Sequence, residues 1–285
     1  MTARHPLFVA LGAQRYQVER PWGDLPSGGG KVTDVVCDDR GHVFVLLRAD
    51  CYVDAAQPTV IELAPDGRRL AGWGEDLADG HMLSIGPDGR IYVVDRDAHE
   101  IVVFDRGGRR IGGIGQRHQP NAPFNHPCDV AIATSGDIYV ADGYGASRVH
   151  RFNPNGDLIA TWGEPGNAAG HFTTPHGIWA LADGRVAVTD RENNRVQVFS
   201  PKGEALAVWS DFYHPMDIFQ DAAGRVYVTD QIPRLSMLAP DGTSLGRCRP
   251  VLNGAHGMWG DRDVNLYMAE MNPSRVTRLT PVRAD

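Results

Sequence analysis

The sequence predicts an all-β protein built as a six-bladed β-propeller. Three observations predict this fold: six stretches of similar sequence, four short strand patterns in each stretch, and no competing segment of helical periodicity. The stretches open at Thr33, His81, Cys128, His176, Met216 and His256, which are 48, 47, 48, 40 and 40 residues apart. Repeats of about 40 to 50 residues are typical of propeller blades.

The second unit shows the four strands expected in one blade. Apolar-rich runs occupy residues 82–85, 90–95, 101–104 and 110–115, and the turn sequence Gly86-Pro87-Asp88-Gly89 separates the first two. Short runs of this kind, bounded by such turns, indicate antiparallel hairpins. The third and fourth units repeat the pattern closely.

The sixth unit shows how the ring closes. It has strand patterns at residues 266–269 and 275–279 and then ends one strand short. Residues 16–23 end in Trp-Gly, as do the outer strands that finish at Trp73-Gly74 and Trp162-Gly163. We therefore expect the N-terminal segment to supply the outer strand of the last blade, which leaves no open seam.

The whole chain, residues 1–285, is expected to form this one propeller domain. The longest insertion, residues 49–58 in the first blade, is expected to cover the mouth of the channel. The four cysteines, Cys37, Cys51, Cys128 and Cys248, form no C-x-x-C pair, so the sequence predicts neither a zinc ribbon nor a disulfide framework.

Charge and hydropathy disfavour several partners. A net charge of −7 and a pI near 5.9 disfavour nucleic-acid binding. No apolar run approaches the roughly 20 residues of a membrane helix, and the N-terminus lacks the features of a signal peptide. We therefore expect a cytoplasmic monomer that binds neither nucleic acid nor membrane.

Three histidines occupy the opening position of alternate units: His81, His176 and His256. On a closed ring they would point at one axis. A single histidine there would more often be a hydrogen-bonded lining residue, but three at trigonal spacing predict a metal site. Three imidazoles and an open position suit catalytic Zn²⁺. Iron, cobalt or nickel would also accept three nitrogen ligands.

The same mouth should carry arginines. Because strand two of each blade runs antiparallel to strand one, its end lies beside the histidine position. That end position holds, in blade order, Arg48, Arg96, Gly143, Arg191, Gln231 and Met271. A guanidinium fork binds a carboxylate through two hydrogen bonds, so Arg48, Arg96 and Arg191 are candidates for substrate binding. The alternative is salt bridges to Asp50 or Glu192, and Asp95 and Asp190 are expected to bind backbone amides.

Tyr144 follows Gly143 at the same mouth, on the blade between those of His81 and His176. A phenol beside a metal cation and two guanidinium groups is expected to have a lowered pKa, because each cation favours the phenolate. Tyr144 is then a candidate general base. An ordinary aromatic platform is the alternative.

These residues carry a family resemblance. The chain resembles NHL-repeat propellers over almost its whole length, and among them the peptidyl-α-hydroxyglycine α-amidating lyases. The resemblance rests on residues 142–148 (DGYGASR), 175–177 (PHG) and 190–199 (DRENNRVQVF). It implies three zinc ligands, a catalytic tyrosine and two active-site arginines, which fall on His81, His176, His256, Tyr144, Arg48 and Arg191.

The chain also departs from that family. The resemblance implies a structural Ca²⁺ held by the carbonyls of Val35 and Leu83 and by an aspartate after the last histidine, where this chain has Gly257. The equivalent position in other blades holds the possible substitutes Asp34, Asp129 and Asp217. Arg96 stands where the family has no arginine, which indicates a more anionic or otherwise different substrate.

Together these features predict a metal-dependent lyase. It would cleave the C–N bond of a carbinolamide (an N-acyl, ureido or peptidyl α-hydroxyglycine), giving an amide and glyoxylate. The partner would be a small-molecule carboxylate, since peptide amidation suits a secretory enzyme better than a cytoplasmic one. The alternatives are a metal-dependent hydrolase such as a lactonase, another lyase, or a non-enzymatic NHL binding scaffold.

Overall fold

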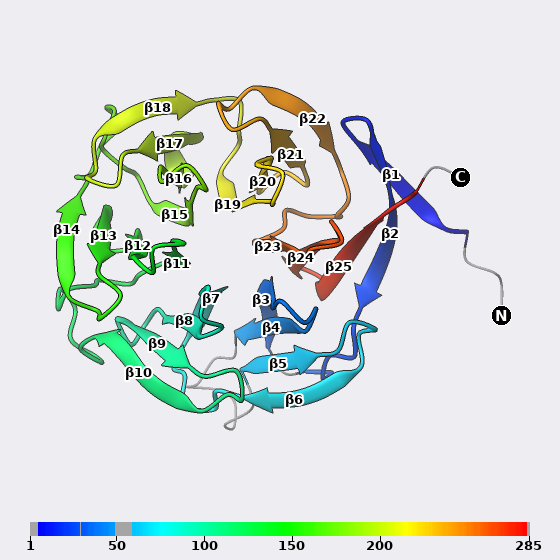
Figure 1. The fold of residues 1–285 in the computed structure, drawn as a ribbon, viewed down its shortest axis with the longest axis horizontal. Helices are drawn as coiled ribbons and strands as arrows, with labels where there is room; N and C mark the ends of the chain where they lie inside the picture. The colour runs from blue at the N-terminus through cyan, green and yellow to red at the C-terminus, as the bar shows by residue number, and fades with distance from the viewer. Residues whose placement is uncertain (1–4, 29, 49–58, 284–285) are drawn as a thin grey trace.

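The computed structural model describes residues 5–28, 30–48 and 59–283. Over these residues it contains 25 strands and one 3₁₀ helix, η1 (Arg191–Asn193). The strands form six sheets arranged around a central axis (Figure 1). The predicted six-bladed, all-β propeller is confirmed. The insertion at 49–58, with Asp50 and Cys51, lies outside the described residues.

The first three blades follow the chain from the axis outward. Blade 1 is β3 (Lys31–Cys37), β4 (Val43–Arg48), β5 (Val60–Leu63) and β6 (Arg69–Trp73). Blade 2 is β7 (Gly80–Ile85), β8 (Ile91–Asp95), β9 (Glu100–Phe104) and β10 (Arg110–Gly115). Blade 3 is β11 (Asp129–Ile132), β12 (Ile138–Asp142), β13 (Arg148–Phe152) and β14 (Leu158–Trp162).

The other three blades complete the ring. Blade 4 is β15 (Pro175–Ala180), β16 (Val186–Asp190), β17 (Arg195–Phe199) and β18 (Ala205–Trp209). Blade 5 is β19 (Pro215–Gln220), β20 (Val226–Asp230), β21 (Leu235–Leu238) and β22 (Ser244–Cys248). Blade 6 is β23 (Gly257–Gly260), β24 (Leu266–Met271), β25 (Ser274–Pro281), β2 (Gln14–Trp22) and β1 (Leu7–Leu11).

Closure of the ring follows the prediction and adds one strand. β2 pairs antiparallel with β25, with Val18 opposite Leu279, so the N-terminal segment does supply the fourth strand of blade 6. β1 then turns back at Gly12 and pairs with β2 as a fifth, outermost strand (Figure 1). The prediction missed β1 because the four-strand repeat contains no counterpart for it. A Cβ on Gly12 would lie 2.7 Å from Met237 Cε, so this hairpin packs against blade 5.

Tryptophans at the ends of outer strands join neighbouring blades. Trp73 of blade 1 packs on Gly108 of blade 2 so closely that a Cβ on this glycine would lie 2.3 Å from the indole. Equivalent contacts join Trp22 to Gly67, Trp162 to Gly203 and Trp209 to Gly242. The Trp-Gly endings therefore reflect interblade packing, and the contact of Trp22 with blade 1 closes the ring.

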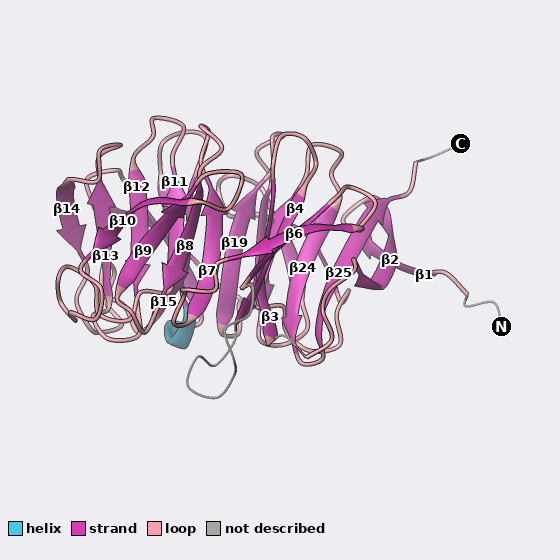
Figure 2. Cartoon of the chain, turned by 90° about the horizontal axis from the view of Figure 1, so that it is seen from below, coloured by secondary structure: helices cyan, strands magenta, loops and turns pink. Residues whose placement is uncertain are grey.

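The inner strands are buried and the outer strands are partly exposed, as in β7 and β10. Apolar side chains fill the space between blades; Phe44, Val93 and Phe104 are part of one such cluster between blades 1 and 2. Cys37, Cys128 and Cys248 are free thiols. No helix among the described residues has the length and hydropathy needed to cross a membrane. Figure 2 shows η1 on the lower face of the ring, the face that carries the site described next.

Candidate metal centre

Three histidines meet on the axis of the propeller. His81 lies in β7, His176 in β15, and His256 immediately before β23, and all three are buried. Their ring centroids are 4.9 to 5.1 Å apart. One ring nitrogen of each lies within 4.8 Å of the other two, and within residues 5–28, 30–48 and 59–283 no other group of three histidine, cysteine or acidic side chains meets this criterion. The structure thus brings the three predicted ligands together.

Local backbone irregularities point two of these side chains at the axis. The register of β7 on β8 shifts between Gly80 and Leu83, and that of β15 on β16 between Pro175 and Ile178. Such bulges turn a side chain away from the regular alternation of a strand. Gly177 beside His176 is required by close packing, since a Cβ there would lie 2.7 Å from the Met216 carbonyl oxygen.

Each histidine is held by the backbone of the next blade. The bonds run from His81 Nδ1 to the Cys128 carbonyl at 2.7 Å, from His176 Nδ1 to that of Met216 at 2.8 Å, and from His256 Nδ1 to that of Thr33 at 2.9 Å. A carbonyl only accepts, so each Nδ1 carries the proton and each Nε2 keeps its lone pair. Metal-binding histidines are oriented by this kind of second hydrogen bond.

Burial and mutual proximity keep the three rings neutral. Desolvation lowers the pKa of all three, to about 4 for His256. Nε2 of His176 is buried with no hydrogen-bond partner, and Nε2 of His81 lies 3.1 Å from the Tyr144 hydroxyl. A buried acceptor without a partner is costly. A divalent cation would engage these nitrogens, so the residues present fit a transition metal such as zinc.

Three aspartates alternate with the histidines around the inner strands. In each, one oxygen accepts from the next residue's amide and the other accepts from an amide of the following blade. The interblade bonds are Leu83 N to Asp34 (2.8 Å), Ile178 N to Asp129 (2.8 Å) and Met258 N to Asp217 (2.6 Å). Histidines link even blades to odd ones and aspartates link odd blades to even ones, so six hydrogen bonds run around the ring.

The residues do not fit the family's calcium site. A Cβ on Gly257 would lie 2.0 Å from Asp34 Oδ1, so the carboxylate of Asp34 fills the space that an aspartate at 257 would need. Both Asp34 oxygens already accept amides, from Val35 and Leu83. Among the described residues, the oxygens of the three aspartates also do not come within 4.8 Å of one another, so they form no cluster for a cation. The calcium prediction, with ligands at Val35 and Leu83, therefore finds no support in this geometry.

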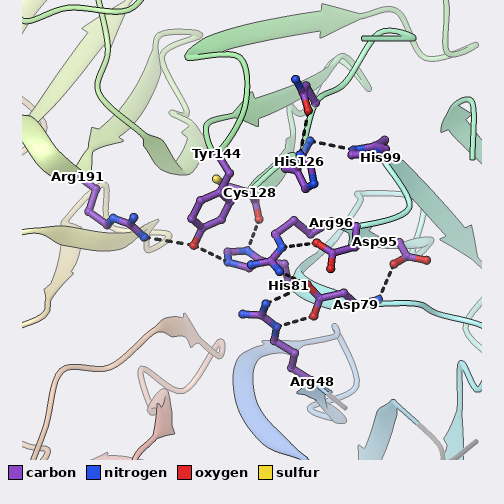
Figure 3. Close-up of polar contacts among 12 residues, drawn as sticks. Arg48, Asp79, His81, Asp95, Arg96, His99, His126, Cys128, Tyr144 and Arg191 are labelled. Carbon is purple, nitrogen blue, oxygen red and sulfur yellow. Dashed lines mark hydrogen bonds and ion pairs between the residues drawn. The ribbon is translucent and has the colours of Figure 1, made fainter. Parts of the chain in front are cut away.

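Tyr144 lies beside His81, in the loop between β12 and β13 (Figure 3). Its hydroxyl is 3.1 Å from His81 Nε2 and 3.2 Å from Arg191 Nη1. The guanidinium groups of Arg96 and Arg191 both lie 5.3 Å from the centre of its ring. Without a cation, desolvation and the neighbouring Cys128 raise the pKa of Tyr144, and the arginines only oppose that rise. The two guanidiniums alone do not outweigh burial, so the predicted lowering of the Tyr144 pKa depends on the metal cation and stays a prediction.

The predicted arginines reach the mouth, and each faces a carboxylate. Arg48 binds Asp79 through Nε (2.5 Å) and Nη2 (2.9 Å), and Arg96 binds the same carboxylate at 2.7 Å (Figure 3). Arg96 also pairs with Asp97, and Arg191 pairs with Glu192 at 2.8 Å. The salt-bridge alternative thus holds for Arg191 and Glu192.

Asp79 is the site residue that the sequence interpretation missed. It lies two residues before His81, and its side chain is only 9% exposed. Its own amide donates to Asp95 Oδ1 at 2.7 Å, so Asp95 fixes the loop that presents Asp79. Asp190 likewise accepts the amide of Thr173, and the predicted structural role of these two rim aspartates is confirmed. The available signal was an acidic residue two positions before a predicted metal ligand.

Comparisons with known proteins agree with this architecture. The NHL repeat family matches residues 124–152 and 172–199. "Peptidyl-glycine alpha-amidating monooxygenase B" of Xenopus laevis is 29% identical over 93% of the chain and 35% of its own length. "Peptidyl-alpha-hydroxyglycine alpha-amidating lyase 2" of Drosophila melanogaster is 28% identical over 72% of the chain and 56% of its own length.

The chain contains NHL repeats and is homologous, at moderate identity, to proteins named peptidyl-α-hydroxyglycine α-amidating lyases. It spans about a third of the length of the relatives named as monooxygenases. Human "NHL repeat-containing protein 3" is as similar, 29% identical over 94% of the chain and 85% of its own length. A solved gluconolactonase from Xanthomonas campestris shares the fold, with a TM-score of 0.71, 14% identity, and 99% of this chain and 96% of that one covered.

Proposed function

We propose that this propeller is a metal-dependent carbinolamide lyase. The observation that carries the proposal is the convergence of three neutral imidazoles whose Nδ1 protons are fixed by backbone carbonyls, with a phenol hydrogen-bonded to one Nε2. The homology to proteins named amidating lyases supports the reaction class. The reaction converts R-CO-NH-CH(OH)-COO⁻ into R-CO-NH₂ and glyoxylate.

His81, His176 and His256 would hold the metal, most simply Zn²⁺. A bound cation supplies a Lewis acid that lowers the pKa of a hydroxyl group placed on it. The three histidines contribute orientation and neutral charge, because their protons stay on Nδ1 at the backbone carbonyls.

Tyr144 is placed to move the proton. In its phenolate form, which a bound cation and Arg191 would favour, its oxygen would accept the proton of the substrate hydroxyl as the C=O bond of glyoxylate forms and the C–N bond breaks. The electron pair of that bond goes to the amide nitrogen, which takes the proton back. Arg191, 3.2 Å from the phenol oxygen, favours the phenolate while the proton is in transit.

The arginines are placed to hold the substrate carboxylate. Glu192 and Asp97, the outer partners of Arg191 and Arg96, have side chains 34% and 35% exposed, so water screens them. Asp79 is much less exposed and holds Arg48 and Arg96 in fixed positions at the mouth. Two guanidiniums around one carboxylate leave a net positive field for an incoming anion.

The test is turnover of N-acetyl-α-hydroxyglycine, followed by glyoxylate release. We expect His176→Ala to lose both metal and activity, and Tyr144→Phe to keep the metal while losing about 100-fold or more in rate, the usual contribution of a general base. Full activity of the metal-free His176→Ala protein would refute the proposal.

A binding scaffold is the second candidate, and the similarity to human NHL repeat-containing protein 3 favours it. The two functions differ in their dependence on the histidines. A scaffold would keep its ligand after His176→Ala and would release no glyoxylate, whereas a lactonase-type hydrolase would consume water and leave the carbinolamide intact.

A further inference from the structure

A cavity of about 220 Å³ opens beside His256, between blades 5 and 6. It lies across the ring from Tyr144 and Arg96 of blades 3 and 2, because its walls come from β19, β24, Gln231 just after β20, and the segment that precedes β23. Its lining residues are Met216, Gln231, Asn253, Gly254, Ala255, His256, Met271 and Asn272. Of these residues, the catalytic arrangement proposed above uses only His256 and the backbone carbonyl of Met216, which holds His176 Nδ1.

The composition of one repeated position divides the mouth into two halves. The residue at or just after the end of the second strand is arginine in blades 1, 2 and 4 (Arg48, Arg96 and Arg191). In blades 5 and 6 it is Gln231 and Met271. Blade 3 has Gly143 there. The same backbone position thus presents cations in three of blades 1 to 4 and uncharged side chains in blades 5 and 6, where the cavity lies.

The cavity is suited to an uncharged group. Apart from the neutral His256, its polar side chains are the amides of Gln231, Asn253 and Asn272, and its apolar walls include Met216 and Met271. Amides offer both donors and acceptors. A charged group moved there would lose water without meeting an opposite charge among the lining side chains, which is costly.

Polar side chains at the lip of the cavity form hydrogen bonds with two of its amide side chains. Lys31 donates to Asn272 Oδ1 at 3.3 Å from an exposed position, and His214 Nδ1 lies 3.2 Å from Gln231 Oε1. Gly254 fits only because it has no side chain, since a Cβ there would lie 2.4 Å from the Asp230 carbonyl oxygen. The shape beside His256 is thus set by backbone packing.

We propose that this cavity binds the acyl side of the substrate and restricts it to a small, uncharged group. The inference rests on the proposed function: the carboxylate lies toward the arginines, the hydroxyl at the histidines, and the R-CO-NH group between blades 5 and 6. The volume equals about seven water molecules at roughly 30 Å³ each, which suits an acetyl, ureido or benzoyl group. A longer peptide would exceed this volume.

The experiment compares N-acetyl-, N-benzoyl- and N-succinyl-α-hydroxyglycine in the wild type and two variants. Met271→Trp fills the cavity and is expected to lower kcat/KM for the benzoyl substrate about tenfold or more relative to the acetyl one, as steric loss in an apolar pocket does. Gln231→Lys adds a cation at the lip and is expected to raise kcat/KM for the succinyl substrate relative to the acetyl one by a similar factor. Gln119→Lys adds the same charge on an exposed loop between blades 2 and 3 and should change neither ratio.

Calorimetry of benzamide binding separates the lyase proposal from the cavity proposal. Benzamide is the amide that the benzoyl substrate would release. If the wild type turns over none of the substrates, the lyase proposal fails, yet the cavity is still tested by whether Met271→Trp abolishes benzamide binding. Unchanged substrate ratios in both variants, or benzamide binding that is absent in the wild type or unaffected by Met271→Trp, would overturn the cavity assignment.

Discussion

Asp79 offers the sharpest test of how the mouth is organised. Replacing it with asparagine keeps its shape but removes the charge that Arg48 and Arg96 share. The amide oxygen of asparagine can still accept a hydrogen bond from one guanidinium. Its NH₂ group cannot accept one, so it would face the N–H donors of the arginines unpaired. Asp97→Asn is the matched control, because Asp97 contacts Arg96 on the exposed side, with a side chain that is 35% exposed.

The expected loss of stability in Asp79→Asn follows from the burial of the three side chains. A hydrogen bond to a charged group contributes roughly 1.5–3 kcal/mol, and Asp79→Asn removes at least one and weakens the others. The side chains of Arg48 and Arg96 are 24% and 21% exposed, so water recovers part of the loss. We expect a loss of about 2 kcal/mol in unfolding free energy, or roughly 4–8 °C in Tm for a chain of this size.

The assay pairs thermal unfolding with kinetics. Because Asp79 positions the arginines without contacting substrate, Asp79→Asn should lower kcat/KM about tenfold or more through misplaced guanidiniums, whereas Asp97→Asn should change it less than about threefold. Asp79→Glu, which restores the charge, should recover part of the loss. Equal behaviour of Asp79→Asn and Asp97→Asn in both assays would refute the positioning role.

Three further predictions address the fold and its charges. Trp73→Ala should lower the unfolding free energy by about 3–5 kcal/mol in urea titrations, because it empties the contact on Gly108; a change below about 1 kcal/mol would contradict the interblade role. Gly257→Ala should lower Tm because its Cβ would meet Asp34 Oδ1, and adding Asp34→Ala should relieve that clash; strictly additive effects would argue against it. Burial raises the pKa of Asp217 to about 7, so the folded state keeps a proton that the unfolded state releases near pH 4, and the stability contributed by this group falls as pH rises from about 4 to 7. The destabilisation by Asp217→Asn should therefore be smaller at pH 7.5 than at pH 5, and a pH-independent difference would contradict the assignment.

The repeat pattern in the sequence predicted most of the fold. Because every blade uses the same backbone positions, alignment of the units placed His81, His176 and His256 on one axis and Arg48, Arg96 and Arg191 at one mouth. The Trp-Gly endings predicted the closing strand β2, since Trp22 makes the same interblade contact as Trp73.

Features outside the repeat escaped prediction. β1 has no equivalent in the other blades, and Asp79 lies in a connecting loop whose course depends on bonds to Asp95. The pKa of Tyr144 depends on a balance between burial and two guanidiniums that spacing does not reveal. The space taken by Asp34 beside Gly257 comes from packing between blades 1 and 6, which no pattern within one unit records.

The convergence of three imidazole lone pairs on the propeller axis is the claim on which the proposed chemistry depends. Elemental analysis of the protein purified without chelators, with zinc added back before gel filtration, tests it most directly. We expect about one transition-metal ion per chain in the wild type and in Tyr144→Phe, and none in His176→Ala. A wild-type protein that retains no metal after this treatment would contradict it.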